Sequence, residues 1–216
     1  RTSAGWSVGG TRTGGIQIGA NGKFQVNVID DNARAYQGEV PIPAQAADGQ
    51  WHHLAFTCRK YGEVRYGDYT FVMIIYLDGR QVAESRINIE SRWQLVVFFA
   101  SSPAAWIGAS QGTSEFLQGQ LAEFRIWKQA RSAEQIKALM NSALRGDEEG
   151  LFAYWPLNEG SGDTANDRAS GKRHGRLRGF PVWFDNKVRG GVGAALLAEV
   201  DKPRDIGLLL RGTGEQ

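Results

Sequence analysis

The sequence predicts an all-β fold, in which antiparallel strands form a sandwich with one short helix at its edge. Glycine is abundant, at 28 of 216 residues, which suits many short strands joined by tight turns. Several stretches alternate apolar and polar residues with the period of a half-buried strand, and only one stretch has helical spacing. The hydrophobic fraction of 42 % and the charged fraction of 22 % allow a substantial core and argue against wholesale disorder.

The first predicted elements are short strands separated by glycine, at residues 6–8 and 16–18, followed by a longer strand at residues 23–29. The dipeptide Asn21-Gly22 just before the longer strand is a strong hairpin-turn signal. In that strand three apolar side chains share one face, as a half-buried strand requires: Phe24, Val26 and Val28.

Residues 51–58, WHHLAFTC, hold two of the three histidines of the chain and its single cysteine. Successive side chains of a strand point to opposite faces, so His52 and His53 diverge and do not readily chelate one ion together. Asp48 is close, but no serine lies nearby to complete a catalytic triad. We therefore expect a sandwich strand with a packed, hydrogen-bonded histidine, and Cys58 as a small core residue.

A hairpin is predicted next, because the long aromatic and β-branched stretch 69–77 is turned by Asp78-Gly79 into residues 80–84. Three further stretches are predicted as strands: 91–100, 106–108 and 121–128.

One helix is predicted at about residues 132–145. Ser132 and Gln135 form a capping box, and Gly146 lies where a C-terminal cap belongs. Apolar residues follow the capping box at helical spacing, namely Ile136, Leu139, Met140, Ala143 and Leu144. A single amphipathic helix among many strands most simply packs on the edge of the sandwich.

After the helix, residues 151–157 read as a strand, 158–171 as a polar loop, and 174–177 and 180–184 as two short strands. The glycine-rich tail, residues 186–216, receives no structural prediction.

Charge and composition exclude several classes of protein. The net charge of +2 does not call for nucleic acid, and no nucleic-acid-binding motif is present. Cys58 has no partner for an intrachain disulfide, and no run approaches the roughly 20 apolar residues of a membrane span. The sequence starts at Arg1 without an initiator methionine or a signal-peptide pattern, so we expect a processed or excised piece.

Five motifs, taken together, carry a family resemblance. They are DGQWHHLAFT (48–57), YLDGRQVAE (76–84), WIGA (106–109), FLQGQLAEFRIWKQARSAEQIKALM (116–140) and GLFAYWPLNEGSGDTANDRASGKRHGRL (150–177). In order and spacing they resemble the laminin-G-like, concanavalin-A-like jelly-roll family of pentraxins, lectins and glucanases, from about residue 48 to 183. The resemblance implies a two-sheet jelly-roll sandwich, which we assign to residues 1–185.

The chain departs from the family pattern at two places. The segment 150–177 opens a module in many relatives but follows the helix here. It either completes this sandwich or begins a second repeat, and we favour the first, since the chain starts as though the opening strands were missing. Ala122 stands where many relatives carry an acidic residue, so the resemblance does not predict a calcium ligand at that position.

The resemblance favours a non-catalytic carbohydrate-binding or adhesion module of a larger protein, extracellular or at the cell surface, although the single cysteine leaves an intracellular location open. Lectin-like sandwiches stack aromatic side chains on sugar rings and hydrogen-bond hydroxyl groups from loops. The aromatic candidates in polar contexts are Tyr36, Tyr66 and Trp93. Each of them could instead pack over the edge of a sheet.

A second candidate surface is the basic stretch GKRHGRLRG, residues 171–179. As a strand it places His174, Arg176 and Arg178 on one face, with Lys172 and Arg173 in the turn before. Such a ridge could bind a sulfated glycan, an anionic lipid or phosphate. The alternative is an edge strand whose positive charge discourages edge-to-edge pairing.

Calcium is a further possibility, because jelly rolls often tie loops together with an ion bound by oxygen atoms. Asp163, Asn166 and Asp167 could supply such ligands, as could residues 30–32. Turns, however, are rich in Asp and Asn for backbone reasons alone.

Two other functions are known for sandwiches of this kind. A retaining glycanase needs two carboxylates about 5 Å apart on one face, an E-x-D-x-E type of strand. The sequence has no such strand, and the acidic run 147–149 follows the helix as a solvated turn, so we expect no catalysis. A protein–protein or assembly module cannot be told from a lectin by these residues.

Overall fold

The computed structural model describes the strands, the helix and most of the chain from residue 120 onward. The described residues are 7–8, 15–18, 23–29, 35–41, 50–64, 68–89, 104–107, 120–179, 182–186, 193–197 and 207–211. Side chains are described at 41, 50–59, 70–86, 88, 107, 120–179 and 183. The strand predicted at 91–100 lies outside the described residues.

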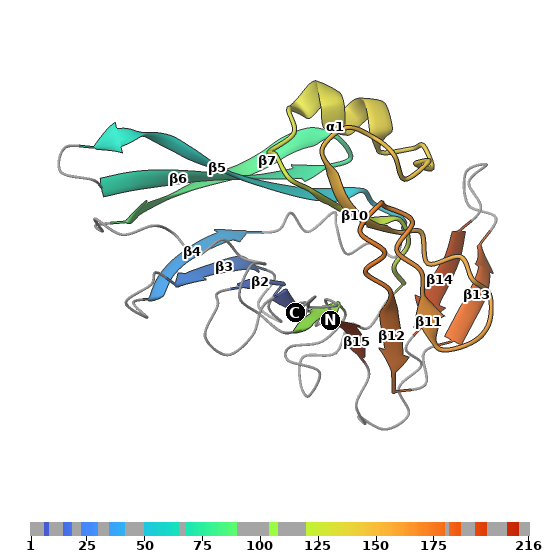
Figure 1. The fold of residues 1–216 in the computed structure, drawn as a ribbon. Coiled ribbons are helices and arrows are strands. Elements are labelled where there is room, and N and C mark those ends of the chain that lie inside the picture. Colours follow the sequence, from blue (N-terminus) through green and yellow to red (C-terminus); the bar gives the residue numbers. More distant parts are fainter. Residues whose placement is uncertain are drawn as a thin grey trace.

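The all-β prediction is confirmed, because every described strand pairing is antiparallel and the described residues hold one short helix. Two layers are visible in Figure 1, with the N-terminal sheet lying across from the sheet β5-β6-β7. The strands of the N-terminal sheet follow chain order: β1 (Ser7–Val8), β2 (Gly15–Ile18), β3 (Lys23–Ile29) and β4 (Ala35–Pro41).

The second layer is built on a long hairpin. Its strands are β5 (Leu54–Val64), β6 (Asp68–Leu77) and β7 (Arg80–Ile89). Asp78 and Gly79 have positive φ angles of 50° and 74°, as the tight turn predicted between β6 and β7 requires.

The middle strand β6 is buried on both faces. Val72, Ile74 and Tyr76 pack with Ile136 of the helix on one face. Met73 is fully buried on the opposite face, because side chains of a strand alternate. The helix therefore covers one side of this sheet, while Figure 1 shows the N-terminal sheet on the other.

Helix α1 (Ala133–Leu139) begins where the sequence predicts and ends earlier. Ser132 is the N-cap, and the complete capping box with Gln135 is present. The predicted end near residue 145 and the cap at Gly146 are wrong, because Met140 is the C-cap. The carbonyl oxygen of Leu139, the last helical residue, accepts a hydrogen bond from Arg125 Nη1 of a neighbouring strand at 2.7 Å, which satisfies it without a further helical turn.

The C-terminal part forms three small antiparallel sheets. The first pairs β9 (Phe124–Trp127) with β10 (Leu151–Trp155). The second has the order β11-β12-β15-β8, with β8 (Ala104–Ile107), β11 (Thr164–Ala165), β12 (Gly175–Arg178) and β15 (Gly207–Arg211). The third pairs β13 (Val182–Asn186) with β14 (Gly193–Leu197). The tail that received no prediction thus contributes β14 and β15.

One hydrophobic core unites this C-terminal part. Ile107, Trp155, Leu157 and Leu177 are buried together, and Trp183 packs against them from β13. The segment after the helix therefore shares its core with β8, and its first strand pairs with β9.

Candidate ligand-binding site

The hairpin of β11 and β12 has an inner and an outer face. Ala165 and Leu177 are buried in the core, whereas Thr164, Arg176 and Arg178 are exposed. Thr164 lies directly opposite Arg176 in the ladder, so these two side chains are neighbours on the outer face. Gly175 and Leu177 alternate with Arg176 and Arg178 along β12, so both arginine side chains point to the exposed face.

We define the basic face as the exposed side chains His174, Arg176 and Arg178. Their exposure agrees with the pattern in the sequence. Arg178 has no ion-pair partner among the described residues. The strand is not an edge, however, since β12 lies between β11 and β15 and hydrogen-bonds to both. The alternative that its charges protect a sheet edge is therefore wrong.

An ion pair stands at the centre of the outer face. Arg176 Nε donates to Asp163 Oδ2 at 3.0 Å, and the two side chains are 63 % and 59 % exposed. The Thr164 hydroxyl donates to Asp163 Oδ1 at 3.2 Å. The hydrogen bond from Thr164, followed by the bond and charge of Arg176, lowers the pKa of Asp163 below its ordinary value. The outer face therefore carries a hydrogen-bond acceptor that stays ionised at neutral pH, between a cationic donor, Arg176, and a hydroxyl donor, Thr164.

Trp183 adds an aromatic ring beside this loop, and the sequence did not point to it. Its indole Nε1 donates to the carbonyl oxygen of Gly162 at 2.9 Å, next to Asp163. The strand period of β13 could have predicted which face of the strand carries Trp183. No pattern in the local sequence, however, predicts its contact with Gly162.

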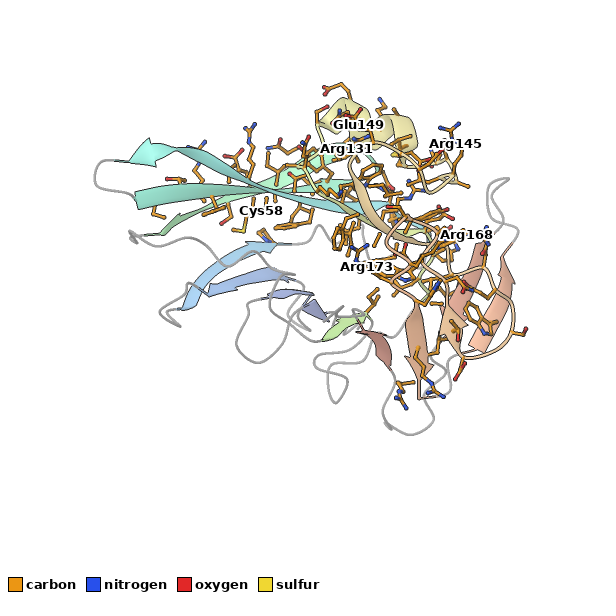
Figure 2. The ribbon with its side chains drawn as sticks, in the orientation of Figure 1. Cys58, Arg131, Arg145, Glu149, Arg168 and Arg173 are labelled. Carbon is orange, nitrogen blue, oxygen red and sulfur yellow. The ribbon has the colours of Figure 1, made fainter. Side chains whose placement is uncertain are left out.

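The turn before β12 separates two basic residues that the sequence grouped together. Lys172 is exposed and has a positive φ angle of 47°. Arg173 instead turns inward (Figure 2), where its guanidinium stacks 3.8 Å from the Phe152 ring centroid and donates to the Phe152 carbonyl oxygen. Lys172, and not Arg173, can therefore extend the basic face.

Asp167 organises the loop behind the site. It is 1 % exposed, and its Oδ1 accepts hydrogen bonds from the backbone N–H groups of Tyr154 and Ala169, at 2.9 and 2.8 Å. Its Oδ2 accepts from the Arg173 backbone N–H at 2.8 Å. The carboxylate thus satisfies three backbone donors that burial would otherwise leave unpaired.

These contacts bear on the predicted calcium site. Asp163 accepts from Arg176 and Thr164, and Asp167 accepts from backbone N–H groups. The backbone N–H and the side-chain Nδ2 of Asn166 both donate to Glu159 Oε1. Within the described parts of the chain no group of three or more His, Cys, Asp or Glu side chains is placed to hold a metal ion. These contacts with other protein groups do not fit an ion shared by all three side chains. Calcium binding stays a prediction, and a fall in the melting temperature on adding EDTA would support it.

The described residues do not test the aromatic part of the predicted site. Tyr36 lies in β4 opposite Val28, and its side chain is not described. Tyr66, Trp93 and residues 30–32 lie outside the described residues.

Comparison with known proteins places the fold in a family. A family model described as the concanavalin A-like lectin/glucanases superfamily matches residues 2–137, which is more than half of the chain. The chain belongs to this superfamily. No curated protein and no solved structure matches it. Among the described residues, no helix is long and apolar enough to span a bilayer.

The superfamily match and the candidate site occupy different parts of the chain. The match begins well before residue 48, where the resemblance in the motifs starts, and ends within α1. The basic face, Asp163 and Trp183 all follow it, so the superfamily assigns them no role. Their role must be argued from their own chemistry.

Proposed function

We propose that this superfamily member is a non-catalytic, lectin-like carbohydrate-binding module, and that the basic face contacts an acidic glycan. The carrying observation is that β12 is an interior strand, so its outward cations have no edge to protect. Arg176 is paired with Asp163, but Arg178 has no ion-pair partner among the described residues, and exposed positive charge on an already paired strand favours an external anion as its partner.

The chemistry of the outer face suits an acidic sugar polymer. Guanidinium groups bind sulfate or carboxylate through paired N–H donors. Arg176 and Arg178 are two residues apart on one strand, which separates their Cα atoms by about 7 Å. Asp163 and Thr164 supply acceptors and a hydroxyl for neutral sugar hydroxyl groups, and Trp183 supplies an aromatic ring beside them.

We further propose that the module holds its ligand without cleaving it and that it works outside the cell or on its surface. The sequence lacks the paired-carboxylate strand of a retaining glycanase. Incubation with a panel of acidic polysaccharides should release no reducing ends, whereas their appearance with the pure chain would refute the non-catalytic part of the proposal.

A glycan array with charge variants tests the binding. We expect hits on sulfated or uronate-containing glycans, binding that weakens steeply with salt, and at least about tenfold weaker binding by Arg176→Gln/Arg178→Gln, as for the loss of two charge-assisted contacts. Arg145→Gln is the matched control, because Arg145 is 81 % exposed and pairs with Asp147 away from β12.

Three results would contradict the proposal. A blank array would favour the alternative of a protein–protein or assembly module. Binding that ignores salt would remove the electrostatic reason for choosing the basic face. Equal losses in the double variant and in Arg145→Gln would show that β12 has no special part in the interaction.

A further inference from the structure

The carboxylate of Asp163 is an anion fixed within the basic face. The Leu177 backbone N–H donates to the carbonyl oxygen of Asp163 at 2.7 Å, and Trp183 Nε1 donates to that of the preceding Gly162 at 2.9 Å. These two bonds hold the loop against β12 and β13. A movement of the loop that carried the carboxylate away from Arg176 would therefore have to break them.

Asp163 and Arg176 together offer both an acceptor and a donor. Asp163 Oδ2 accepts from Arg176 Nε at 3.0 Å, and among the described residues Nη1 and Nη2 of Arg176 have no hydrogen-bond partner. The Asp163 side chain is 59 % exposed, and its only other side-chain partner within the described ranges is the Thr164 hydroxyl. The pair therefore presents N–H donors next to carboxylate oxygen atoms.

This combination suits a neutral hydroxyl group better than an anion. A hydroxyl group both donates and accepts a hydrogen bond, whereas a sulfate or carboxylate group only accepts. The hydrogen bond from Thr164, followed by that from Arg176, lowers the pKa of Asp163, so the carboxylate keeps its charge at neutral pH. An anionic group beside Arg176 would consequently meet a like charge.

Arg178 offers the opposite chemistry on the same strand. It is exposed and has no ion-pair partner in the described part of the chain. Its Cα atom lies two residues from that of Arg176, about 7 Å along the strand. The basic face thus has one place for an anion and, next to it, one place for a hydroxyl group.

We propose that Asp163 is a specificity-determining residue of the basic face, which accepts a sugar hydroxyl group and repels a second anionic group at the same place. It shifts the preference of the module from densely sulfated glycans toward acidic glycans that have neutral sugars between their charges. The inference rests on the proposed function, because it requires an acidic glycan along β12.

Two physical effects act in the same direction. A hydroxyl group that donates to a carboxylate makes a charge-assisted hydrogen bond, which is roughly twice as strong as one to a neutral acceptor. An anionic group at that place is repelled, although water and salt screen the repulsion to about threefold in affinity at an exposed site. Repulsion of this kind is a general means of discriminating between similar ligands.

Affinities for two soluble probes test the inference. Hyaluronan oligosaccharides carry a carboxylate on alternate sugars and no sulfate, and heparin oligosaccharides of equal length carry sulfate on most sugars. Isothermal titration calorimetry with the full 216-residue chain at one salt concentration gives the ratio of the two dissociation constants. Asp163→Asn should bind heparin about threefold more tightly and hyaluronan about threefold more weakly, which shifts the ratio about tenfold. Asp163→Ser also removes the charge and should shift the ratio in the same direction.

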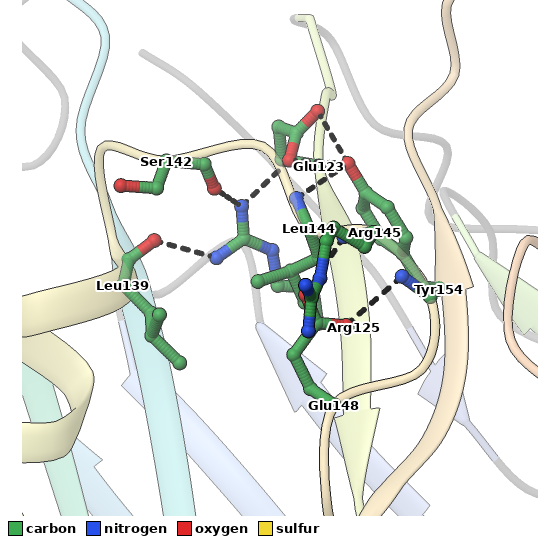
Figure 3. Close-up of polar contacts among 9 residues, drawn as sticks. Glu123, Arg125, Leu139, Ser142, Leu144, Arg145, Glu148 and Tyr154 are labelled. Carbon is green, nitrogen blue, oxygen red and sulfur yellow. Dashed lines mark hydrogen bonds and ion pairs between the residues drawn. The ribbon is translucent and has the colours of Figure 1, made fainter.

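Asp147→Asn is the matched control, because it removes the same charge from another exposed ion pair. Arg145 Nε and Asp147 Oδ1 are 3.1 Å apart, and the two side chains are 81 % and 72 % exposed. The pair lies in the turn after α1, where the Arg145 backbone N–H donates to Glu148 Oε1 at 2.7 Å (Figure 3). We expect this substitution to leave the ratio unchanged.

The possible failures of the inference and of the proposed function can be told apart. An unchanged ratio in Asp163→Asn, an equal rise in its affinity for both probes, or an equal shift in Asp147→Asn would overturn the inference alone. A wild-type chain that binds neither probe, or whose binding is unaffected by Arg176→Gln/Arg178→Gln, would refute the proposed function and the inference with it.

Discussion

The buried carboxylate of Asp167 offers the sharpest test of how the C-terminal part is held together. Asp167→Asn keeps the shape but replaces one oxygen by an N–H₂ group. If the amide oxygen retains the bonds from Tyr154 and Ala169, the N–H₂ group faces the backbone N–H of Arg173, and two donors oppose each other. A buried donor left unpaired costs about 1–3 kcal/mol, and the two retained bonds lose their charge assistance, so we expect about 3 kcal/mol of destabilisation.

For a chain of this length, about 3 kcal/mol lowers the melting temperature by about 6–12 °C. Thermal and urea unfolding followed by far-UV circular dichroism measure the change. Asp163→Asn is the matched control: it removes a carboxylate from the same loop, but an exposed one, and should leave the midpoint nearly unchanged. A loss for Asp167→Asn that is no larger than the control would show that the carboxylate does not support the backbone as described.

Three further substitutions or treatments probe other parts of the fold. Gly146→Ala should cost more than about 2 kcal/mol in urea unfolding, since residue 146 has a φ angle of 99° and a Cβ atom would lie 2.2 Å from the Arg168 carbonyl oxygen. Gly160→Ala, also at positive φ but in open space, should cost only about 1 kcal/mol, and equal losses would contradict the clash. Tyr154→Phe should lower the free energy of unfolding by about 1–3 kcal/mol, because the Leu144 N–H and the Glu123 carboxylate lose their hydroxyl partner. An unchanged free energy of unfolding would show that these two hydrogen bonds do not stabilise the fold. Burial raises the pKa of the Cys58 thiol to about 11, so the native chain should react with a thiol reagent at pH 8 far more slowly than the urea-unfolded chain, and equal rates would argue against its burial.

Local patterns in the sequence predicted the elements well, because they depend on neighbours within a few residues. The strand at Lys23–Ile29 and the turn at residues 78–79 were found in the structure where they were expected. The start of α1 was predicted because both partners of its capping box, Ser132 and Gln135, lie within one turn. The outward direction of Arg176 follows equally from the period of a strand.

Contacts between distant segments decided what the sequence could not predict. The last carbonyl group of α1, at Leu139, is bound by Arg125, which is 14 residues away along the chain. His52 Nδ1 binds Asp78, on a turn 26 residues away along the chain. The interior position of β12 depends on β15, in a tail whose composition gave no strand pattern. Each of these is a tertiary contact between residues far apart along the chain, and no local sequence pattern predicts which residues will meet.

The three backbone hydrogen bonds that the buried Asp167 carboxylate accepts also bear on how the outer face would bind a ligand. Because one carboxylate joins β10, the loop and the turn before β12, the platform beneath the basic residues is ordered before any ligand arrives. Capture then costs little conformational entropy beyond that of the arginine side chains themselves. Weakening these three hydrogen bonds should consequently shorten the residence time of a bound polymer. The association rate, which long-range charge controls, should stay almost unchanged.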